Sequence, residues 1–185
     1  MALTGASSPV EITRHMKTTR WGIIFCSALV LAVAAGCAAK RKVPTEREQK
    51  EAALYASEGQ FALNMKQWPR AEENYLKAAR ASPEGNYYLS LGLARLRQNK
   101  RSEAKAAYEE AVRAFADDAV RAPDFSEAWL RQAFVLAALG RMDESRAVIA
   151  QAAKKFPNDA KVRALTDPKA FEQMIAAPNF KEVAL

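Results

Sequence analysis

The residues best suited to nucleophilic or metal chemistry are concentrated near the start of this 185-residue sequence. Its two cysteines are Cys26 and Cys37, and its one histidine is His15. A cysteine thiolate can act as a nucleophile, bind a metal or be acylated, and histidine is its usual general base. These residues lie before, within or just after one apolar run. The chemistry open to the rest of the chain therefore depends on whether that run is retained.

The first 36 residues have the pattern of a secretory leader. The run WGIIFCSALVLAVAAG at 21–36 is uncharged and follows Arg14, Lys17 and Arg20. A basic segment followed by an apolar stretch of about fifteen residues is typical of a signal peptide. A membrane span needs about twenty apolar residues, so the run is short for one. We predict that residues 1–36 are removed.

The leader ends in Ala34-Ala35-Gly36-Cys37, which resembles the lipobox of bacterial lipoproteins. The resemblance implies that Cys37 is acylated and begins the mature chain. Ala38, in place of Asp, is similar to lipoproteins sorted to the outer membrane, so the implied location is the periplasmic face of the outer membrane of a Gram-negative bacterium. The alternative is a lone cysteine at the end of an uncleaved helix.

Removal of the leader would leave one acylated cysteine and no histidine. A disulfide within the mature chain, a Cys/His zinc site and hydrolysis through an imidazole base would then be excluded. We expect the start of translation at Met1 or at Met16, since Met16 would open a leader of ordinary length.

Adjacent carboxylates are the remaining candidates for acid–base chemistry, at Glu72-Glu73 and at Glu109-Glu110. Neighbours in sequence point different ways on a helix, so neither pair is expected to share one cleft. We interpret both pairs as solvated, outward-facing residues. We therefore predict no enzymatic activity, no cofactor and no metal site.

Residues 37–44 form a short basic tether that contains Lys40-Arg41-Lys42. Beside a lipidated cysteine this charge favours an anionic membrane surface, and a solvated linker without a partner is the alternative. The formal net charge of the whole chain is only +7. Such a mild balance, spread along the chain, argues for solubility and against nucleic acid as a partner.

Small and aromatic residues recur at fixed offsets in three segments, at about 52–84, 85–118 and 126–159. Small residues let two helices approach closely, and aromatic residues fill the gaps beside them. The intervals are 33 and 41 residues, and we assign the excess to a longer helix with an insert at 116–125. The residues that we predict to form the repeat core are Tyr55, Gly59, Ala71, Tyr75, Tyr88, Gly92, Ala104, Tyr108, Trp129, Ala133 and Ile149.

This pattern resembles the tetratricopeptide repeat, whose period is roughly 34 residues. The resemblance implies an all-α fold, a short right-handed α-solenoid of about three helix-turn-helix repeats over residues 45–165. Residues 166–185, which contain DPKAFEQMIAAPNF, are similar to the closing segment that follows the last repeat. We predict a capping box at Thr45 and Glu48, and helix caps at Ser102 and Asp143.

In the tetratricopeptide family, the first helices of successive repeats line a concave groove that holds a segment of a partner. The positions that the resemblance assigns to this groove are Leu63, Asn64, Leu89, Leu93, Leu96, Arg97, Leu130 and Phe134. Most are apolar, so we predict an apolar or amphipathic helical segment of a partner protein as the ligand. The alternatives are that the C-terminal helix folds back on this face or that the face forms a homodimer.

The function implied is a non-enzymatic, membrane-anchored scaffold in the cell envelope that aids assembly of an envelope complex, as pilotin lipoproteins do. The alternative is a transporter-accessory lipoprotein that binds a small hydrophobic ligand in the periplasm. A large closed cavity would favour that alternative, and an open groove would favour the scaffold.

Overall fold

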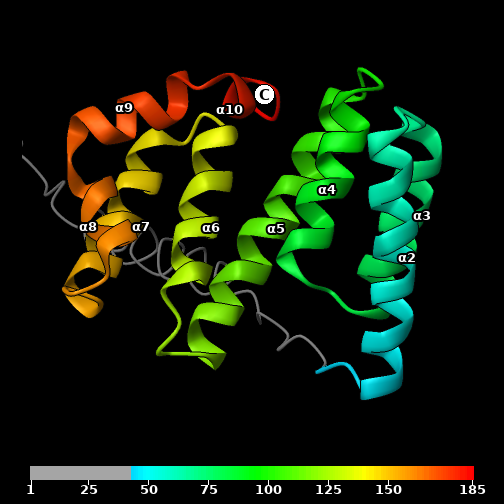
Figure 1. Ribbon diagram of the computed structural model, residues 1–185, viewed down its shortest axis with the longest axis horizontal. Coiled ribbons are helices and arrows are strands. Elements are labelled where there is room, and N and C mark those ends of the chain that lie inside the picture. Colours follow the sequence, from blue (N-terminus) through cyan, green and yellow to red (C-terminus); the bar gives the residue numbers. More distant parts are fainter. Residues whose placement is uncertain (1–42) are drawn as a thin grey trace, which may run out of the picture. The chain divides into compact units, whose positions relative to one another are not determined.

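The computed structural model describes residues 43–185, and helices make up most of this part of the chain (Figure 1). The predicted leader, Cys37 and the first six residues of the tether lie outside the described residues. The helices are α2 (Glu46–Asn64), α3 (Trp68–Ala81), α4 (Gly85–Leu96), α5 (Arg101–Arg121), α6 (Ser126–Ala138), α7 (Met142–Lys155), α8 (Ala160–Thr166), α9 (Pro168–Ala176) and α10 (Pro178–Lys181). None of them is long and apolar enough to cross a membrane.

The helices form three hairpins that stack in sequence order. α2 packs on α3, α4 on α5 and α6 on α7, and α3–α4 and α5–α6 join neighbouring hairpins. Each hairpin turns at a residue of positive φ, namely Lys66 (57°), Asn99 (61°) and Gly140 (76°). These turn residues are spaced by the same 33 and 41 residues as the sequence pattern. The predicted all-α stack of three helix pairs is confirmed.

The second hairpin contains the insert. α5 has 21 residues, whereas α3 and α7 have 14 each. The excess is close to two turns of helix, so the buried face of α5 continues in phase. The extension ends in exposed apolar side chains, since Val120 is 80% exposed and Phe125 is 58% exposed.

In two of the hairpins, the two helices pack closely because a glycine on the first helix contacts a tyrosine on the second. In the first hairpin, a Cβ added at Gly59 would lie 3.0 Å from Cδ2 of Tyr75. In the second, a Cβ added at Gly92 would overlap the ring of Tyr108, which is fully buried. The ring of Tyr108 therefore occupies the space that any larger residue at position 92 would need.

In the third hairpin, other residues form the contact that glycine and tyrosine make in the first two. Ala133 and Ile149 take the places of glycine and tyrosine, and both are buried. The buried hydroxyl of Ser145 donates to the carbonyl oxygen of Ala133 at 2.7 Å. Of the predicted repeat-core residues, Ala71 and Ala104 are also fully buried. The aromatic residues Tyr55, Tyr88 and Trp129 are only partly buried.

Of the last three helices, α8 lies at the end of the stack, and α9 and α10 run back across it towards α4 (Figure 1). α8 packs on α7, and α9 and α10 follow it. The side chain of Asp167 caps α9 by accepting from the backbone N–H of Lys169 at 2.9 Å. Phe171 and Phe180 are buried in the same apolar cluster as Ile149, which explains why this segment stays on the stack.

Of the predicted caps, one set is confirmed and the other is wrong. Thr45 and Glu48 form the expected capping box at the start of α2. Ser102 and Asp143 do not cap helices, because the N-caps of α5 and α7 are Lys100 and Arg141, two residues earlier, and these N-caps make no side-chain hydrogen bond. The turn geometry, with its residue of positive φ, sets these two helix starts.

We predict that Gly92→Ala lowers the free energy of unfolding by about 1–3 kcal/mol, because the new methyl group overpacks against Tyr108. The loss should appear although alanine is the better helix former by about 1 kcal/mol. Gly59→Ala is the matched control, since Tyr75 leaves slightly more room there, and it should change stability little. Urea denaturation of both variants measures the difference, and equal effects would rule out the tight contact at Gly92.

Candidate functional site

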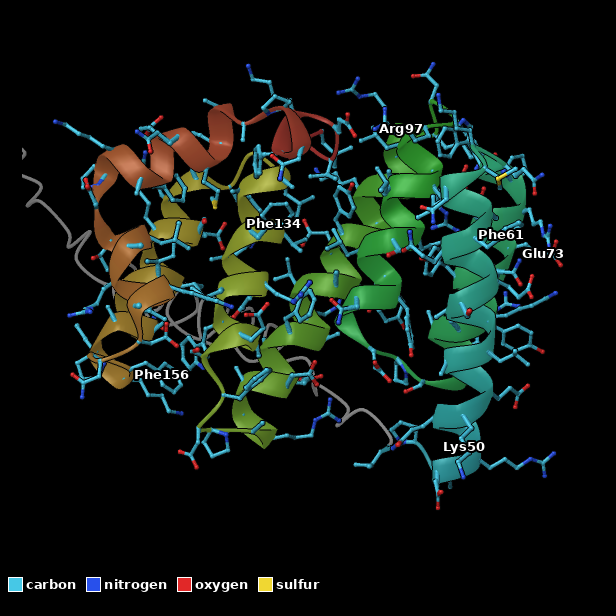
Figure 2. All side chains as sticks on the ribbon, in the orientation of Figure 1. Lys50, Phe61, Glu73, Arg97, Phe134 and Phe156 are labelled. Atoms are coloured by element: carbon cyan, nitrogen blue, oxygen red, sulfur yellow. The ribbon has the colours of Figure 1, made fainter. Side chains whose placement is uncertain are left out.

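The residues predicted to line a groove lie on the first helices of the hairpins, where the repeat spacing gives them equivalent positions. We call this surface the first-helix face, and its residues are Ala56, Gln60, Leu63 and Asn64 on α2, Leu89, Leu93, Leu96 and Arg97 on or next to α4, and Leu130, Phe134, Ala137 and Ala138 on α6. Every predicted leucine and Phe134 is partly buried, whereas Asn64 and Arg97 are exposed. Figure 2 shows Arg97 and Phe134 on this side of the stack.

The chemistry of the first-helix face changes along the stack. On α2 the amide of Gln60 donates to the side-chain oxygen of Asn64 at 3.0 Å. The equivalent pair on α4 is Leu93 and Arg97, and on α6 position 134 is aromatic. The α2 end is therefore polar, and the α4–α6 end combines apolar side chains with one cation.

The hydroxyl groups of the two core tyrosines, Tyr75 and Tyr108, differ in hydrogen bonding, because α2 and α4 carry different residues on this face. The hydroxyl of Tyr75 donates to Oε1 of Gln60 at 3.1 Å. The equivalent hydroxyl of Tyr108 is buried and has no hydrogen-bond partner among residues 43–185. Leu93 is the residue equivalent to Gln60, and its side chain cannot accept a hydrogen bond from Tyr108. Burial raises the pKa of the Tyr108 phenol, and the positive charge of Arg97 opposes this in part.

The end of the chain covers the α4–α6 part of this face. We call residues 178–185 the C-terminal segment. Phe180 packs edge-on against Phe134, with ring centroids 5.3 Å apart and planes at 86°. Glu182 Oε2 lies 2.7 Å from Nη2 of Arg97, and the backbone N–H of Leu185 donates to the carbonyl of Ala138 at 2.9 Å.

These contacts correspond to one of the alternatives that the sequence left open, the folded-back C-terminal helix. Phe134 was expected to face a partner, but in the structure Phe180 covers it. The C-terminal segment therefore folds back onto the first-helix face at this end. Sequence reasoning missed Glu182, whose contact with Arg97 joins positions 85 residues apart and leaves no local pattern.

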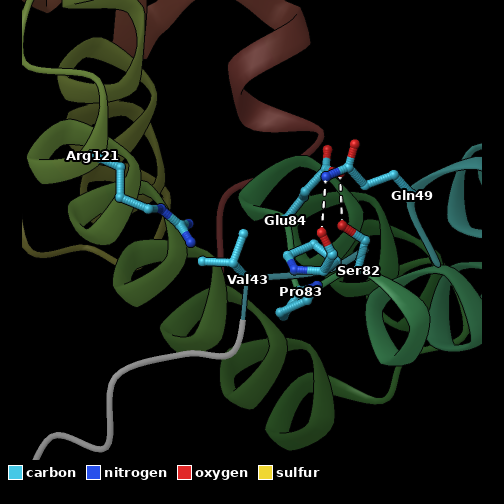
Figure 3. A pocket seen from close by; sticks show the side chains of 7 residues that line it. Val43, Gln49, Ser82, Pro83, Glu84 and Arg121 are labelled. Carbon is cyan, nitrogen blue, oxygen red and sulfur yellow. Dashed lines mark hydrogen bonds between the residues drawn. The ribbon is translucent and has the colours of Figure 1, made fainter. Parts of the chain in front are cut away.

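Two cavities in the described part of the chain lie away from this face. One of about 230 Å³ is bounded by Val43, Pro44, Ser82, Glu84 and Arg121 among others, with Ser82 Oγ donating to Glu84 at 2.9 Å (Figure 3). The other, of about 160 Å³, lies beside α7, α8 and α9. Typical ligand pockets measure about 300–1,000 Å³. Neither cavity supports the small-ligand alternative.

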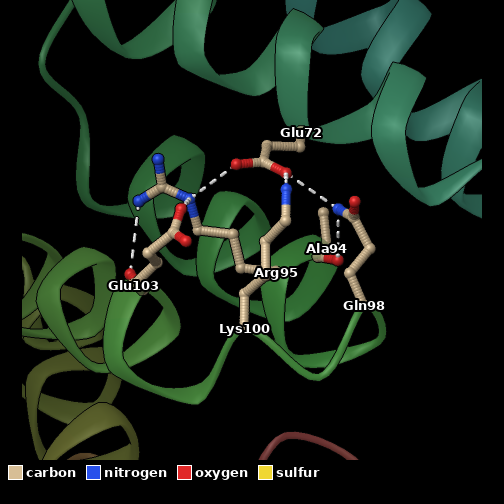
Figure 4. A network of polar contacts seen from close by, with 6 residues as sticks. All are labelled: Glu72, Ala94, Arg95, Gln98, Lys100 and Glu103. Atoms are coloured by element: carbon tan, nitrogen blue, oxygen red, sulfur yellow. Dashed lines mark hydrogen bonds and ion pairs between the residues drawn. The ribbon is translucent and has the colours of Figure 1, made fainter.

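Glu72 is not the solvated residue that the sequence suggested. Its side chain is only 14% exposed, and it joins the first hairpin to the turn of the second (Figure 4). Oε1 accepts from Arg95 at 3.0 Å, and Oε2 accepts from Gln98 at 2.8 Å and from Lys100 at 2.6 Å. Partial burial alone would raise the pKa of Glu72, but these donors outweigh it and lower the pKa.

The other carboxylates also have structural roles. Glu109 pairs with Arg141 at 2.8 Å and so joins the second hairpin to the turn of the third. Glu110 pairs with Arg113 on its own helix. Glu73 is exposed as expected and pairs with Lys77. Within residues 43–185 there is no group of three acidic, histidine or cysteine side chains that could hold a metal ion.

We expect Tyr75→Phe to lower the free energy of unfolding by about 1 kcal/mol, because it removes a hydrogen bond to Gln60. Tyr108→Phe should cost nothing or stabilise the fold, because the hydroxyl that it removes is buried without a partner. Denaturation curves of the two variants under identical conditions test the contrast. Equal losses would mean that both hydroxyls are bonded.

We expect Glu72→Gln to lower the free energy of unfolding at pH 7 by about 1–2 kcal/mol, because it removes the charged acceptor of three donors. The carboxylate stabilises the fold fully above pH 4.5, the usual glutamate value, and this is lost as the pH falls through the lowered pKa. The difference from the wild type should therefore shrink below pH 4.5. Glu73→Gln is the exposed control and should change little at either pH, and a Glu72→Gln effect that is constant with pH would contradict the network.

Comparison with known proteins identifies the repeat type. Residues 89–160 match the family described as Tetratricopeptide repeat. This region spans the second and third hairpins, from α4 to the start of α8. The comparison with curated proteins gave no match.

Two solved structures are distantly similar. The tetratricopeptide repeat domain of Arabidopsis OM64 shares 18% identity, with a TM-score of 0.42, over 70% of this chain and 98% of that domain. The TPR2B domain of yeast Sti1, solved in complex with pHsp70, shares 19% identity, with a TM-score of 0.44, over 72% and 96% of the two chains. The match to the repeat family covers residues 89–160, and the all-α stack of helix hairpins is consistent with a short α-solenoid of such repeats.

Proposed function

We propose that this protein is a non-enzymatic scaffold of the cell envelope that binds a segment of a partner protein on its first-helix face. The observation that carries the proposal is that this face already binds a short peptide segment, which is the C-terminal segment of the same chain. Peptide recognition in a groove uses aromatic packing, a cation that pairs with a carboxylate of the peptide, and a backbone carbonyl that accepts a hydrogen bond. The same elements are suited to a segment from another protein.

We propose further that the scaffold is anchored in the outer membrane through an acylated Cys37. The leader pattern and the cysteine that ends it support this. The last residues of the tether also support it, because Val43 shares a cavity with Arg121 at the end of α5. Val120 and Phe125 flank that arginine and are exposed. Exposed apolar side chains next to a basic residue suit contact with an anionic lipid surface.

A role in assembly follows from combining an anchor with a peptide-binding face. A lipoprotein held at the membrane can hold a segment of an envelope component close to the site where that component is built, as pilotins do. The α2 end of the face, with Gln60 and Asn64 exposed, remains open beside the part that the C-terminal segment covers. A partner segment can make its first contacts there.

We predict that Cys37→Ser moves the protein from the membrane fraction to the soluble fraction and abolishes incorporation of a clickable fatty acid. Because acylation would be its only anchor, both readouts should change together. Labelling that persists in Cys37→Ser would overturn the anchoring.

Partner binding is tested in the same cells with Leu93→Glu, which places a charge in the first-helix face. Crosslinking and pull-down from envelopes should lose one component with Leu93→Glu and retain it with Leu54→Glu. Leu54 is a matched control because it is 64% exposed and lies outside the first-helix face. Identical catches from the two variants would show that this face is not the binding site.

A further inference from the structure

We propose that the C-terminal segment is an internal ligand whose chemistry matches that of the partner. The inference rests on the proposed function and specifies its ligand. The partner would present a short helical turn with an aromatic residue followed, two positions later, by a carboxylate. In this chain those residues are Phe180 and Glu182.

Three contacts of different kinds hold the segment on the first-helix face. Phe180 is 3% exposed and packs on Phe134, which supplies apolar burial. Glu182 pairs with Arg97 at 2.7 Å, and the N–H of Leu185 donates to the carbonyl of Ala138. One contact selects a ring, one selects a negative charge, and one binds the backbone, so together they define a sequence pattern.

The guanidinium of Arg97 is oriented by a neighbouring aromatic ring so that it can bind a carboxylate. Its guanidinium carbon lies 5.9 Å from the ring centre of Trp68 at the start of α3, while Nη2 faces Glu182. Stacking on an aromatic ring orients a guanidinium and leaves its N–H groups free to bind an anion. The side chain of Arg97 is 35% exposed in the presence of the segment, so a partner in solution can reach it.

The C-terminal segment can dissociate from the first-helix face while the three hairpins stay folded. α10 has only four residues, and a helix of that length is not stable by itself. Within residues 43–185, the bond from Leu185 to Ala138 is its one backbone hydrogen bond to another helix. The ion pair is partly exposed on both sides, and such pairs contribute little to stability. Apolar packing therefore provides most of the attachment, through the buried Phe180 and the partly buried Val183, Ala184 and Leu185.

A competing partner must overcome the tether. A segment joined to its own binding site by a short linker acts at an effective concentration in the millimolar range.

The test uses a fluorescent synthetic peptide with the sequence of residues 177–185, APNFKEVAL, and the full-length chain. Anisotropy should show weak binding to the wild type and at least tenfold tighter binding to Phe180→Ala, whose own segment no longer occupies the face. A peptide with alanine in place of its phenylalanine should not bind. Equal affinity of the peptide for the wild type and for Phe180→Ala would overturn the proposal.

A charge exchange provides the second arm and does not depend on Phe180→Ala remaining folded. The peptide carrying Glu182→Lys should bind poorly to the wild type, and it should bind the Arg97→Glu chain, whose own Glu182 now faces a like charge and is displaced. Lys181→Ala is the matched control, since Lys181 is exposed in the same turn, and it should leave peptide affinity unchanged. Failure of the charge exchange to restore binding would remove Arg97 as the carboxylate site.

The two proposals fail separately. Loss of an envelope component with Leu93→Glu, without any peptide competition in solution, would support the scaffold and overturn the internal ligand. Peptide competition without capture of an envelope component would support the internal ligand and overturn the envelope scaffold.

Discussion

The structure depends on how closely the two helices of each hairpin can approach. In the second hairpin the ring of Tyr108 lies in the space where a side chain at position 92 would begin, so only glycine fits. This contact brings α4 and α5 together along their length and fixes the direction in which α4 presents Leu93 and Arg97. A looser pair would rotate or separate these helices, and the first-helix face would lose its alignment with α6.

Neighbouring hairpins are aligned by polar contacts at their turns. Glu72 of α3 binds Lys100 at the turn of the second hairpin, and Glu109 of α5 binds Arg141 at the turn of the third. Lys100 and Arg141 are equivalent residues, each following a turn residue of positive φ. Neighbouring hairpins are therefore joined both by apolar packing between their helices and by these polar pairs. A helix stack that must present one continuous face needs both.

The C-terminal segment gives the first-helix face two properties at once. Its Phe180 covers part of Phe134, so less of the apolar surface of the face is exposed to water. It also leaves the ion pair with Arg97 partly exposed and the hydroxyl of Tyr108 unpaired. A cover that satisfied every group would be part of the core. A cover that leaves groups unsatisfied can be exchanged for a ligand that fits better.

Local patterns were enough to predict the all-α class, the three helix pairs and the insert that lengthens α5. These features depend on local patterns, namely small and aromatic residues at helical spacing and a fixed offset between repeats. The capping box at Thr45 was predictable for the same reason, because both partners lie within one turn.

The tertiary structure decided which candidate residues share a site. Glu72 was indistinguishable in sequence from its solvated neighbour Glu73, because burial depends on a turn more than twenty residues away. The pairing of Glu182 with Arg97 and of Phe180 with Phe134 likewise joins distant parts of the chain. Contacts of this kind arise only when the stack is complete and its end folds back, so no local pattern encodes them.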